Sequence, residues 1–138
     1  MLGGTYKHSI DEKGRMVVPA KYKTILGDVF VITAGIVDDT LMIMSMPEWD
    51  KFFARYSSLP LSKTQETRAR FNGNQYDVSF DKQGRMQIPQ QLRELINLGE
   101  EVVIVGKGEF AEIRNATSSA ELVKPAKSAF DEMAELGI

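Results

Sequence analysis

The chain carries two copies of one short segment. Residues 9–19 and 79–89 have Ser, Asp, Gly, Arg, Met and Pro at matching places. The spacing between matching residues is constant and equals the spacing between Asp11 and Asp81. Each copy of an internal repeat folds as one structural unit. Because neither half of the 138-residue chain has enough apolar residues for a core of its own, we expect the copies to fold against each other as one pseudo-symmetric β-barrel.

The composition excludes several kinds of site. The chain has no cysteine, which rules out disulfides and thiolate metal sites and suits a reducing compartment. His8 is the single histidine, so a multi-histidine metal cluster is excluded. No apolar run approaches the roughly 20 residues that span a bilayer, and the N-terminus has no signal-peptide pattern. We therefore expect a cytoplasmic protein without a metal, a cofactor or a membrane partner.

The charges are distributed unevenly along the chain, whose formal net charge is −2. Residues 1–23 have five Lys and Arg side chains against two carboxylates, whereas residues 109–138 have six carboxylates against three Lys and Arg side chains. A small basic face on an acidic protein can still bind DNA, with a modest salt-dependent contribution from each protomer.

Strand, turn and helix signals follow the same order in both halves. In the first half they predict a strand over 5–10, a turn over 11–14, a returning strand over 15–18, a short helix over 19–26, and strands over 29–33 and 41–44. In the second half they predict a strand over 75–80, a turn over 81–84, a returning strand over 85–88, a short helix over 89–96, and strands over 102–105 and 110–113.

Two further helices are predicted between the halves. Pro47 suits the start of the first, whose apolar stripe at spacing i, i+3, i+4, i+7 favours core packing over stacking on bases. The stripe consists of Trp49, Phe52, Phe53 and Tyr56. Ser62 and Gln65 form a capping-box pattern that starts the second helix, which runs to about Asn72. We expect the basic residues of this second helix to form a solvated face: Lys63, Arg68 and Arg70.

The C-terminal segment has the pattern of an amphipathic helix. Ser118 and Glu121 offer another capping box, and Gly137 is a suitable end. The apolar face consists of Ala126, Ala129, Phe130 and Met133. These patterns divide the chain into a first repeat over 1–56, a helical connector over 57–74, a second repeat over 75–117 and a C-terminal helix over 118–138.

The repeated Asp-x-x-Gly-Arg turn is the strongest functional candidate. Gly14 supplies the positive φ of a tight turn, whose tip directs Lys13 and Arg15 outward. Arginine presents a planar fork of donors that suits phosphate or the O6/N7 edge of guanine. Asp11 can hold that guanidinium or cap the amides of the turn, so a purely structural Asp–Arg pair is the alternative interpretation.

A set of motifs along the chain is typical of one known family. The motifs are Gly3-Gly4-Thr5-Tyr6, Asp11-x-Lys13-Gly14-Arg15-Met16-x-Val18-Pro19, Pro47-Glu48-Trp49, Asp81-x-x-Gly84-Arg85-x-x-Ile88-Pro89 and Val103-Ile104-Val105-Gly106. At this spacing, from about Leu2 to Ile113, they resemble the MraZ family of bacterial transcriptional regulators, within the broader AbrB/SpoVT-like group.

The resemblance implies a fold and a function. The fold is mainly β with short helices, a double-split (swapped-hairpin) β-barrel built from two tandem repeats in one chain. The function is that of a sequence-specific, nucleoid-associated DNA-binding regulator of the division and cell-wall gene cluster. Such a regulator binds direct repeats of double-stranded DNA upstream of its own gene as a ring-like homo-oligomer.

The resemblance also implies which residues contact DNA. They are Lys7, Lys13, Gly14, Arg15, Lys82 and Arg85, with Asp11, Asp81 and Gly84 supporting the motif. The second copy has Gln83 where the first has Lys13, so we do not expect the two turns to contribute equally. Arg114 follows Glu112-Ile113 where many family members carry Trp, a departure that concerns the packing of the C-terminal segment.

Other functions have less support in the sequence. The chain lacks a Gly-rich phosphate loop, a nucleophile beside a histidine and any metal-ligand spacing, so we expect neither an enzyme nor a small-molecule substrate. Two alternatives remain open: an AbrB-like antitoxin or protein-interaction module, and a protein-only ring scaffold whose Asp–Arg pairs are structural.

Overall fold

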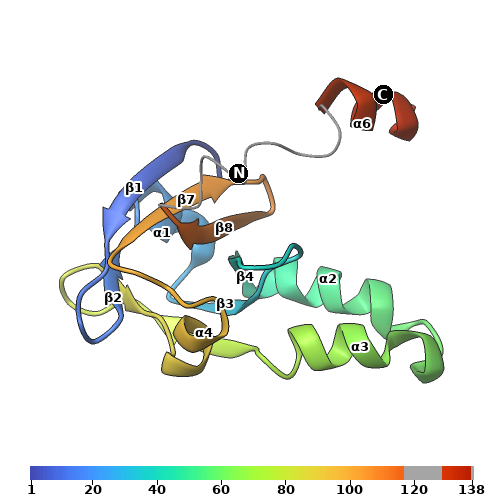
Figure 1. Cartoon of the computed structure of the whole chain (residues 1–138), viewed down its shortest axis with the longest axis horizontal. Coiled ribbons are helices and arrows are strands. Elements are labelled where there is room, and N and C mark those ends of the chain that lie inside the picture. The colour runs from blue at the N-terminus through green and yellow to red at the C-terminus, as the bar shows by residue number, and fades with distance from the viewer. Residues whose placement is uncertain (117–128, 138) are drawn as a thin grey trace.

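The computed structural model describes residues 1–116 and 129–137, and two antiparallel sheets built from both halves form its centre (Figure 1). The strands of the larger sheet are β1 (Thr5–Ser9), β7 (Glu101–Gly106), β8 (Phe110–Asn115), β4 (Leu41–Ser45), β3 (Val29–Ala34) and β5 (Tyr76–Ser79), in this spatial order. The smaller sheet is a two-stranded ribbon of β2 (Arg15–Val17) and β6 (Arg85–Gln87). The fold is therefore mainly β and matches the double-split β-barrel that the resemblance implies.

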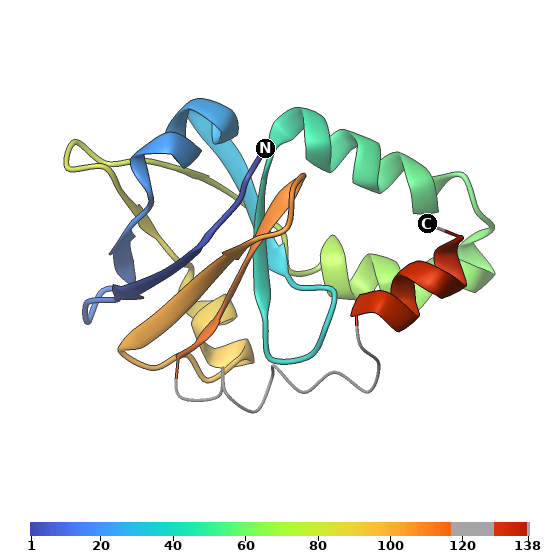
Figure 2. The same cartoon turned by 90° about the horizontal axis from the view of Figure 1, so that it is seen from above.

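Short helices follow the ribbon strands at matching places in the two halves. α1 (Ala20–Leu26) begins after Pro19, and α4 (Gln90–Leu95) begins after Pro89. Proline suits a helix start because its φ is already helical and its missing N–H would be unpaired there. α2 (Met46–Ser57) and α3 (Leu61–Phe71) lie side by side at the opposite end of the molecule from the ribbon (Figure 2).

The two strand–turn–strand repeats interlock. The predicted turns form, because Asp11 N donates to Arg15 O and Asp81 N donates to Arg85 O. Beyond the turns, the strands that flank each turn do not pair with each other as a continuous hairpin, which agrees with the swapped-hairpin fold that the resemblance implies. β1 pairs with β7 and β5 with β3, while β2 pairs with β6. In each repeat, the two strands that flank the turn therefore separate and pair with strands elsewhere in the chain. Strands of one half thus pair with strands of the other half.

The main core is filled by matching residues of the two halves. Met16 faces Met86 across the ribbon, and both side chains are buried. The offset that relates Met16 to Met86 also relates three more pairs of buried side chains: Val18 and Ile88, Tyr22 and Leu92, and Leu26 and Ile96. Each pair has one residue from the first repeat and one from the second. The core therefore forms only when both repeats fold together.

A second apolar cluster covers the other face of the large sheet. Trp49 and Tyr56 are buried, and Phe52 packs edge-on against Phe71 of α3 with ring centroids 5.0 Å apart. The interpretation of the aromatic stripe as core packing is therefore confirmed. Ser45 caps α2, since its Oγ accepts a hydrogen bond from Glu48 N at 3.4 Å.

The capping box predicted at Ser62 does not form. α3 begins at Leu61, directly after Pro60, and no side chain caps its N-terminus. Pro60 already holds the backbone at a φ of −57°, so the helix starts one residue earlier than the pattern suggests and Ser62 lies inside it.

The basic residues of α3 differ from the predicted solvated face. Arg70 donates from Nε to Gly35 O at 2.8 Å, and the guanidinium of Arg68 lies 5.9 Å from the ring centroid of Tyr56. The prediction is wrong for these two arginines, because both secure α3 to its neighbours. Lys63 is exposed as expected.

The C-terminal helix is observed in part. α6 covers Ala129–Leu136, precedes Gly137 with its φ of +74°, and has no buried residue. The predictions for Ser118, Glu121 and Ala126 concern positions outside the described residues. Among residues 1–116 and 129–137, no helix combines the length and the apolar character that crossing a membrane requires.

Residues 1–72 expressed alone should not fold cooperatively. The cut removes β7, β6, β5 and β8, and with them the partners of β1, β2, β3 and β4 outside the first half. Circular dichroism melting should show no cooperative transition for this fragment, and co-expression with residues 73–138 should restore one. A well-dispersed first half that melts cooperatively by itself would contradict the interlocked core.

Candidate nucleic-acid interface

Both repeated turns lie at one end of the molecule, joined by the β2–β6 ribbon (Figure 1). In the ribbon Arg15 lies opposite Gln87, Met16 opposite Met86, and Val17 opposite Arg85. This register places a pseudo-two-fold axis between the two methionines. The axis exchanges Arg15 with Arg85, so the two arginines of the motif are brought to one face although they come from opposite halves of the chain.

One carboxylate organises the first turn. Asp11 Oδ1 accepts hydrogen bonds from the backbone N–H groups of Lys13 and Arg15, both at 2.9 Å. Its Oδ2 accepts from Arg15 Nε at 2.7 Å. The two roles proposed for Asp11 from the sequence, capping the amides and holding the guanidinium, are therefore filled at the same time.

The second turn repeats this geometry. Asp81 Oδ1 accepts from the backbone N–H groups of Gln83 and Arg85 at 2.9 Å, and its Oδ2 accepts from Arg85 Nε at 2.9 Å. In both turns the hydrogen bond from the backbone N–H of the arginine is the largest cause that lowers the pKa of the aspartate below its ordinary value of 3.8. Both carboxylates are therefore ionised at neutral pH.

The guanidinium groups of Arg15 and Arg85 differ in how many of their nitrogens already interact with carboxylates. Arg15 uses Nε on Asp11, and its terminal nitrogens make no hydrogen bond within the described residues. Arg85 likewise uses Nε on Asp81, but its Nη1 also lies 3.9 Å from Asp11 Oδ2. The side chains of Arg15 and Arg85 are 33% and 27% exposed, so each projects less than the sequence suggested, while Lys13 is exposed as expected. Arg15 has the more available donor fork.

Each turn also contacts a basic side chain of the opposite half. Gly14 and Gly84 have φ values of +81° and +76°, which favour glycine. A Cβ on Gly14 would overlap the guanidinium of Arg93 in α4, and a Cβ on Gly84 would overlap Lys23 Nζ of α1. Lys23 and Arg93 are themselves related by the offset of the repeat.

Sequence reasoning missed these two basic residues. The identical segment ends at Pro19 and Pro89, but extending the alignment by four residues pairs Lys23 with Arg93 as two cations at one position. That signal was available in the repeat. Their location over the opposite glycine was not, because it depends on the exchange of strands between the halves.

A cavity of about 320 Å³ lies between the two arginines. It is lined by Arg15, Ser79, Phe80, Asp81, Arg85 and Gln87. The lining joins donors from both halves to one aromatic ring, a combination suited to an anionic or planar partner such as a nucleic acid.

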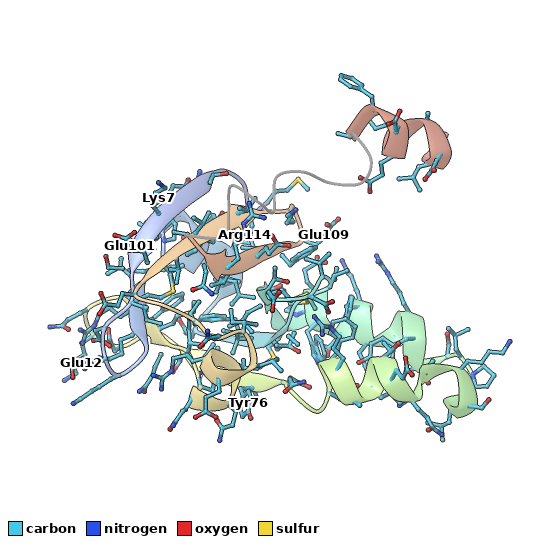
Figure 3. All side chains as sticks on the ribbon, in the orientation of Figure 1. Lys7, Glu12, Tyr76, Glu101, Glu109 and Arg114 are labelled. Atoms are coloured by element: carbon cyan, nitrogen blue, oxygen red, sulfur yellow. The ribbon has the colours of Figure 1, made fainter. Side chains whose placement is uncertain are left out.

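The remaining residues implied by the resemblance lie in two places. Lys82 is exposed on the second turn. Lys7 lies on β1 near Glu101, away from the turn that carries Glu12 (Figure 3), and lines a separate cavity with His8. The structure thus brings Lys13, Arg15, Lys82 and Arg85 to one end of the molecule and does not bring Lys7 to the ribbon. Within the described residues, no three side chains form a group that could hold a metal ion.

Comparisons with known proteins agree with this arrangement of two repeats. A family described as "MraZ protein, putative antitoxin-like" matches residues 1–72 and, a second time, residues 71–134. A protein of Halothermothrix orenii named transcriptional regulator MraZ is 40% identical, with both chains covered completely. Proteins of the same name from Thermoanaerobacter pseudethanolicus and Caldanaerobacter subterraneus subsp. tengcongensis are 38% and 37% identical, over 98% of this chain and 95% of theirs.

The turn carboxylates should give the fold an acid-sensitive component. Because the folded-state pKa values of Asp11 and Asp81 are lowered, their contribution to stability is fully present above about pH 4 and is lost as the pH falls through those lowered values. Carboxyl titration by NMR should place both midpoints below 3.8. Asp11→Asn and Asp81→Asn should each weaken the acid dependence of the melting temperature below about pH 4, relative to the unsubstituted protein. An acid dependence in both variants that equals that of the unsubstituted protein would contradict the assigned role.

Proposed function

The chain belongs to the MraZ family, and we propose that it is a DNA-binding transcriptional regulator that reads promoter DNA with the β2–β6 ribbon and the two turns beside it. The relatives named above are called transcriptional regulators, which supports the regulatory role. We therefore also propose that the protein associates with the nucleoid.

The observation that carries this proposal is the outer face of the ribbon. Side chains alternate along a strand, so Met16 and Met86 enter the core while Arg15, Val17, Arg85 and Gln87 share the opposite face. The major groove of B-DNA admits a two-stranded ribbon. Arginine pairs with guanine, glutamine pairs with adenine, and an apolar side chain contacts the methyl group of thymine. The ribbon therefore carries the side chains needed to distinguish bases.

The turns beside the ribbon supply phosphate contacts. Lys13 and Lys82 are exposed, and the carboxylates of Asp11 and Asp81 are already occupied by arginine Nε atoms. Lysine contacts to phosphate position a protein on DNA and add a salt-dependent contribution that is independent of sequence. A chain with a net charge of −2 can bind DNA in this way because four of its cations lie at one end: Lys13, Arg15, Lys82 and Arg85.

We further propose that the protein acts as a ring of identical chains on direct repeats. The proposed site is the promoter of the division and cell-wall gene cluster, upstream of its own gene. Several apolar side chains outside the ribbon are about half exposed or more, and a neighbouring chain that covered them would remove their apolar surface from water. They are Ile36, Val37, Leu59 and Leu61. Several ribbons on repeated sites raise the overall affinity by roughly 10²–10⁴ through effective concentration.

Substitution of Arg15 should weaken binding more than substitution of Arg85. Arg15→Ala should cost about 1–3 kcal/mol for each engaged protomer if the guanidinium reads a base edge. Arg85→Ala should cost less because Arg85 also interacts with Asp11. Lys13→Ala should lower affinity on all sequences and reduce the salt slope by about one unit. The measurement is a salt-titrated mobility shift on DNA upstream of the gene, with melting temperatures recorded for each variant.

The same measurements separate the alternatives. Water screens these partly exposed Asp–Arg pairs, so the variants should melt close to the unsubstituted protein. If Arg15→Ala unfolds the protein while Lys13→Ala leaves DNA affinity unchanged, the turn is scaffold. Absence of salt-dependent DNA binding by the unsubstituted protein would favour an antitoxin-like module or a protein-only ring instead.

The assembly should be visible without DNA. Sedimentation velocity at micromolar concentration should show a species several times the 15.5 kDa of one chain. Leu61→Glu should shift the distribution toward smaller species if its apolar surface contacts a neighbouring chain, whereas Lys63→Glu on the same helix should shift it less. A single 15.5 kDa species for the unsubstituted protein would contradict the ring.

A further inference from the structure

The second turn gathers cations from both halves of the chain. The turn itself has Lys82 where the first turn has Glu12, and Gln83 where the first turn has Lys13. We propose that Lys23 is a further DNA phosphate contact at the second turn, an inference that rests on the proposed function of the ribbon.

Lys23 lies at the second turn although it belongs to the first half. A Cβ on Gly84 would overlap Lys23 Nζ, so the ammonium group occupies the space directly beside the turn. The same Nζ lies 5.7 Å from the ring centroid of Phe80. Because Phe80 lines the cavity between Arg15 and Arg85, Lys23 stands at the edge of the same surface as the two arginines.

The ammonium group of Lys23 is available for a ligand. Among the described residues it has no ion pair and no hydrogen bond, and its contact with Phe80 uses only the face of the ring. A lysine ammonium carries three donors. The aromatic ring of Phe80 holds the Lys23 side chain in place and leaves the three donors of the ammonium group for a phosphate oxygen.

The matching residue in the other half has a different role. Arg93 Nε donates to Ile88 O at 3.0 Å, and Arg93 shares a cavity with the carboxylates of Asp11, Glu12 and Glu100. Its charge is therefore surrounded by acidic groups and its Nε is already used by the backbone. Arg93 therefore braces the first turn, whereas Lys23 leaves its ammonium group available beside the second. With Lys23, the second turn presents Arg85 and two lysines, Lys82 and Lys23.

The test is a charge-exchange series in the full-length protein. Lys23→Gln should reduce the slope of log affinity against log salt by about one unit for each engaged protomer on promoter DNA. Adding Gln83→Lys to Lys23→Gln should restore that slope, because it places a lysine at the position that Lys13 holds in the first turn. Lys51→Gln is the matched control: it removes a lysine on α2 that is paired with Glu48 at the opposite end of the molecule, and it should leave the slope unchanged.

The outcomes distinguish this inference from the proposed function. If the unsubstituted protein does not bind the DNA, both fail. If Arg15→Ala weakens binding but Lys23→Gln keeps the full salt slope, the role of Lys23 alone is overturned. If Lys23→Gln lowers the melting temperature and Gln83→Lys restores neither slope nor affinity, Lys23 is a structural brace and the inference is also overturned.

Discussion

The antiparallel pairing of β2 with β6 determines the rest of this structure. It is a contact between equivalent strands of the two repeats, and it places Met16 against Met86 at the centre of the core. Because side chains alternate along a strand, burying the two methionines directs Arg15 and Arg85 to the opposite face of the same ribbon. The packing that stabilises the barrel and the surface that presents the arginines are therefore two faces of one pair of strands.

Under the proposed function, the Asp–Arg pair serves both as scaffold and as part of the DNA surface, which the sequence offered as alternatives. Asp11 closes its turn through two backbone N–H groups and also holds Arg15 Nε. Fixing Nε restricts the long side chain but leaves the terminal nitrogens of the fork without a partner among the described residues. A side chain that is ordered in advance loses less entropy when it binds. A structural pair of this kind is thus compatible with a DNA contact and favours it.

The sequence predicts the elements of this fold better than their partners. The turns, the proline-started helices and the aromatic stripe of α2 follow from local signals, and all of them form. The pairing of β1 with β7 could not be read in the same way, because a turn signal specifies that the chain reverses and not which strand it then meets. The capping box at Ser62 failed for a similar reason, since Pro60 had already started the helix. Lys23 was missed because its place over Gly84 follows from the exchanged strands rather than from any nearby residue.

Interlocking also places a side chain of each half beside the turn of the other, as Arg93 beside Gly14 and Lys23 beside Gly84 show. The ribbon is symmetric in Arg15 and Arg85 but not in Val17 and Gln87, which occupy matching positions with different chemistry. An apolar side chain and an amide favour different bases, so the proposed DNA surface has a direction along the duplex. A surface with a direction suits sites repeated head to tail rather than inverted. Identical chains arranged head to tail close into a ring when their rotation allows it. The divergence between Val17 and Gln87 thus supports the proposed binding to direct repeats and the proposed ring.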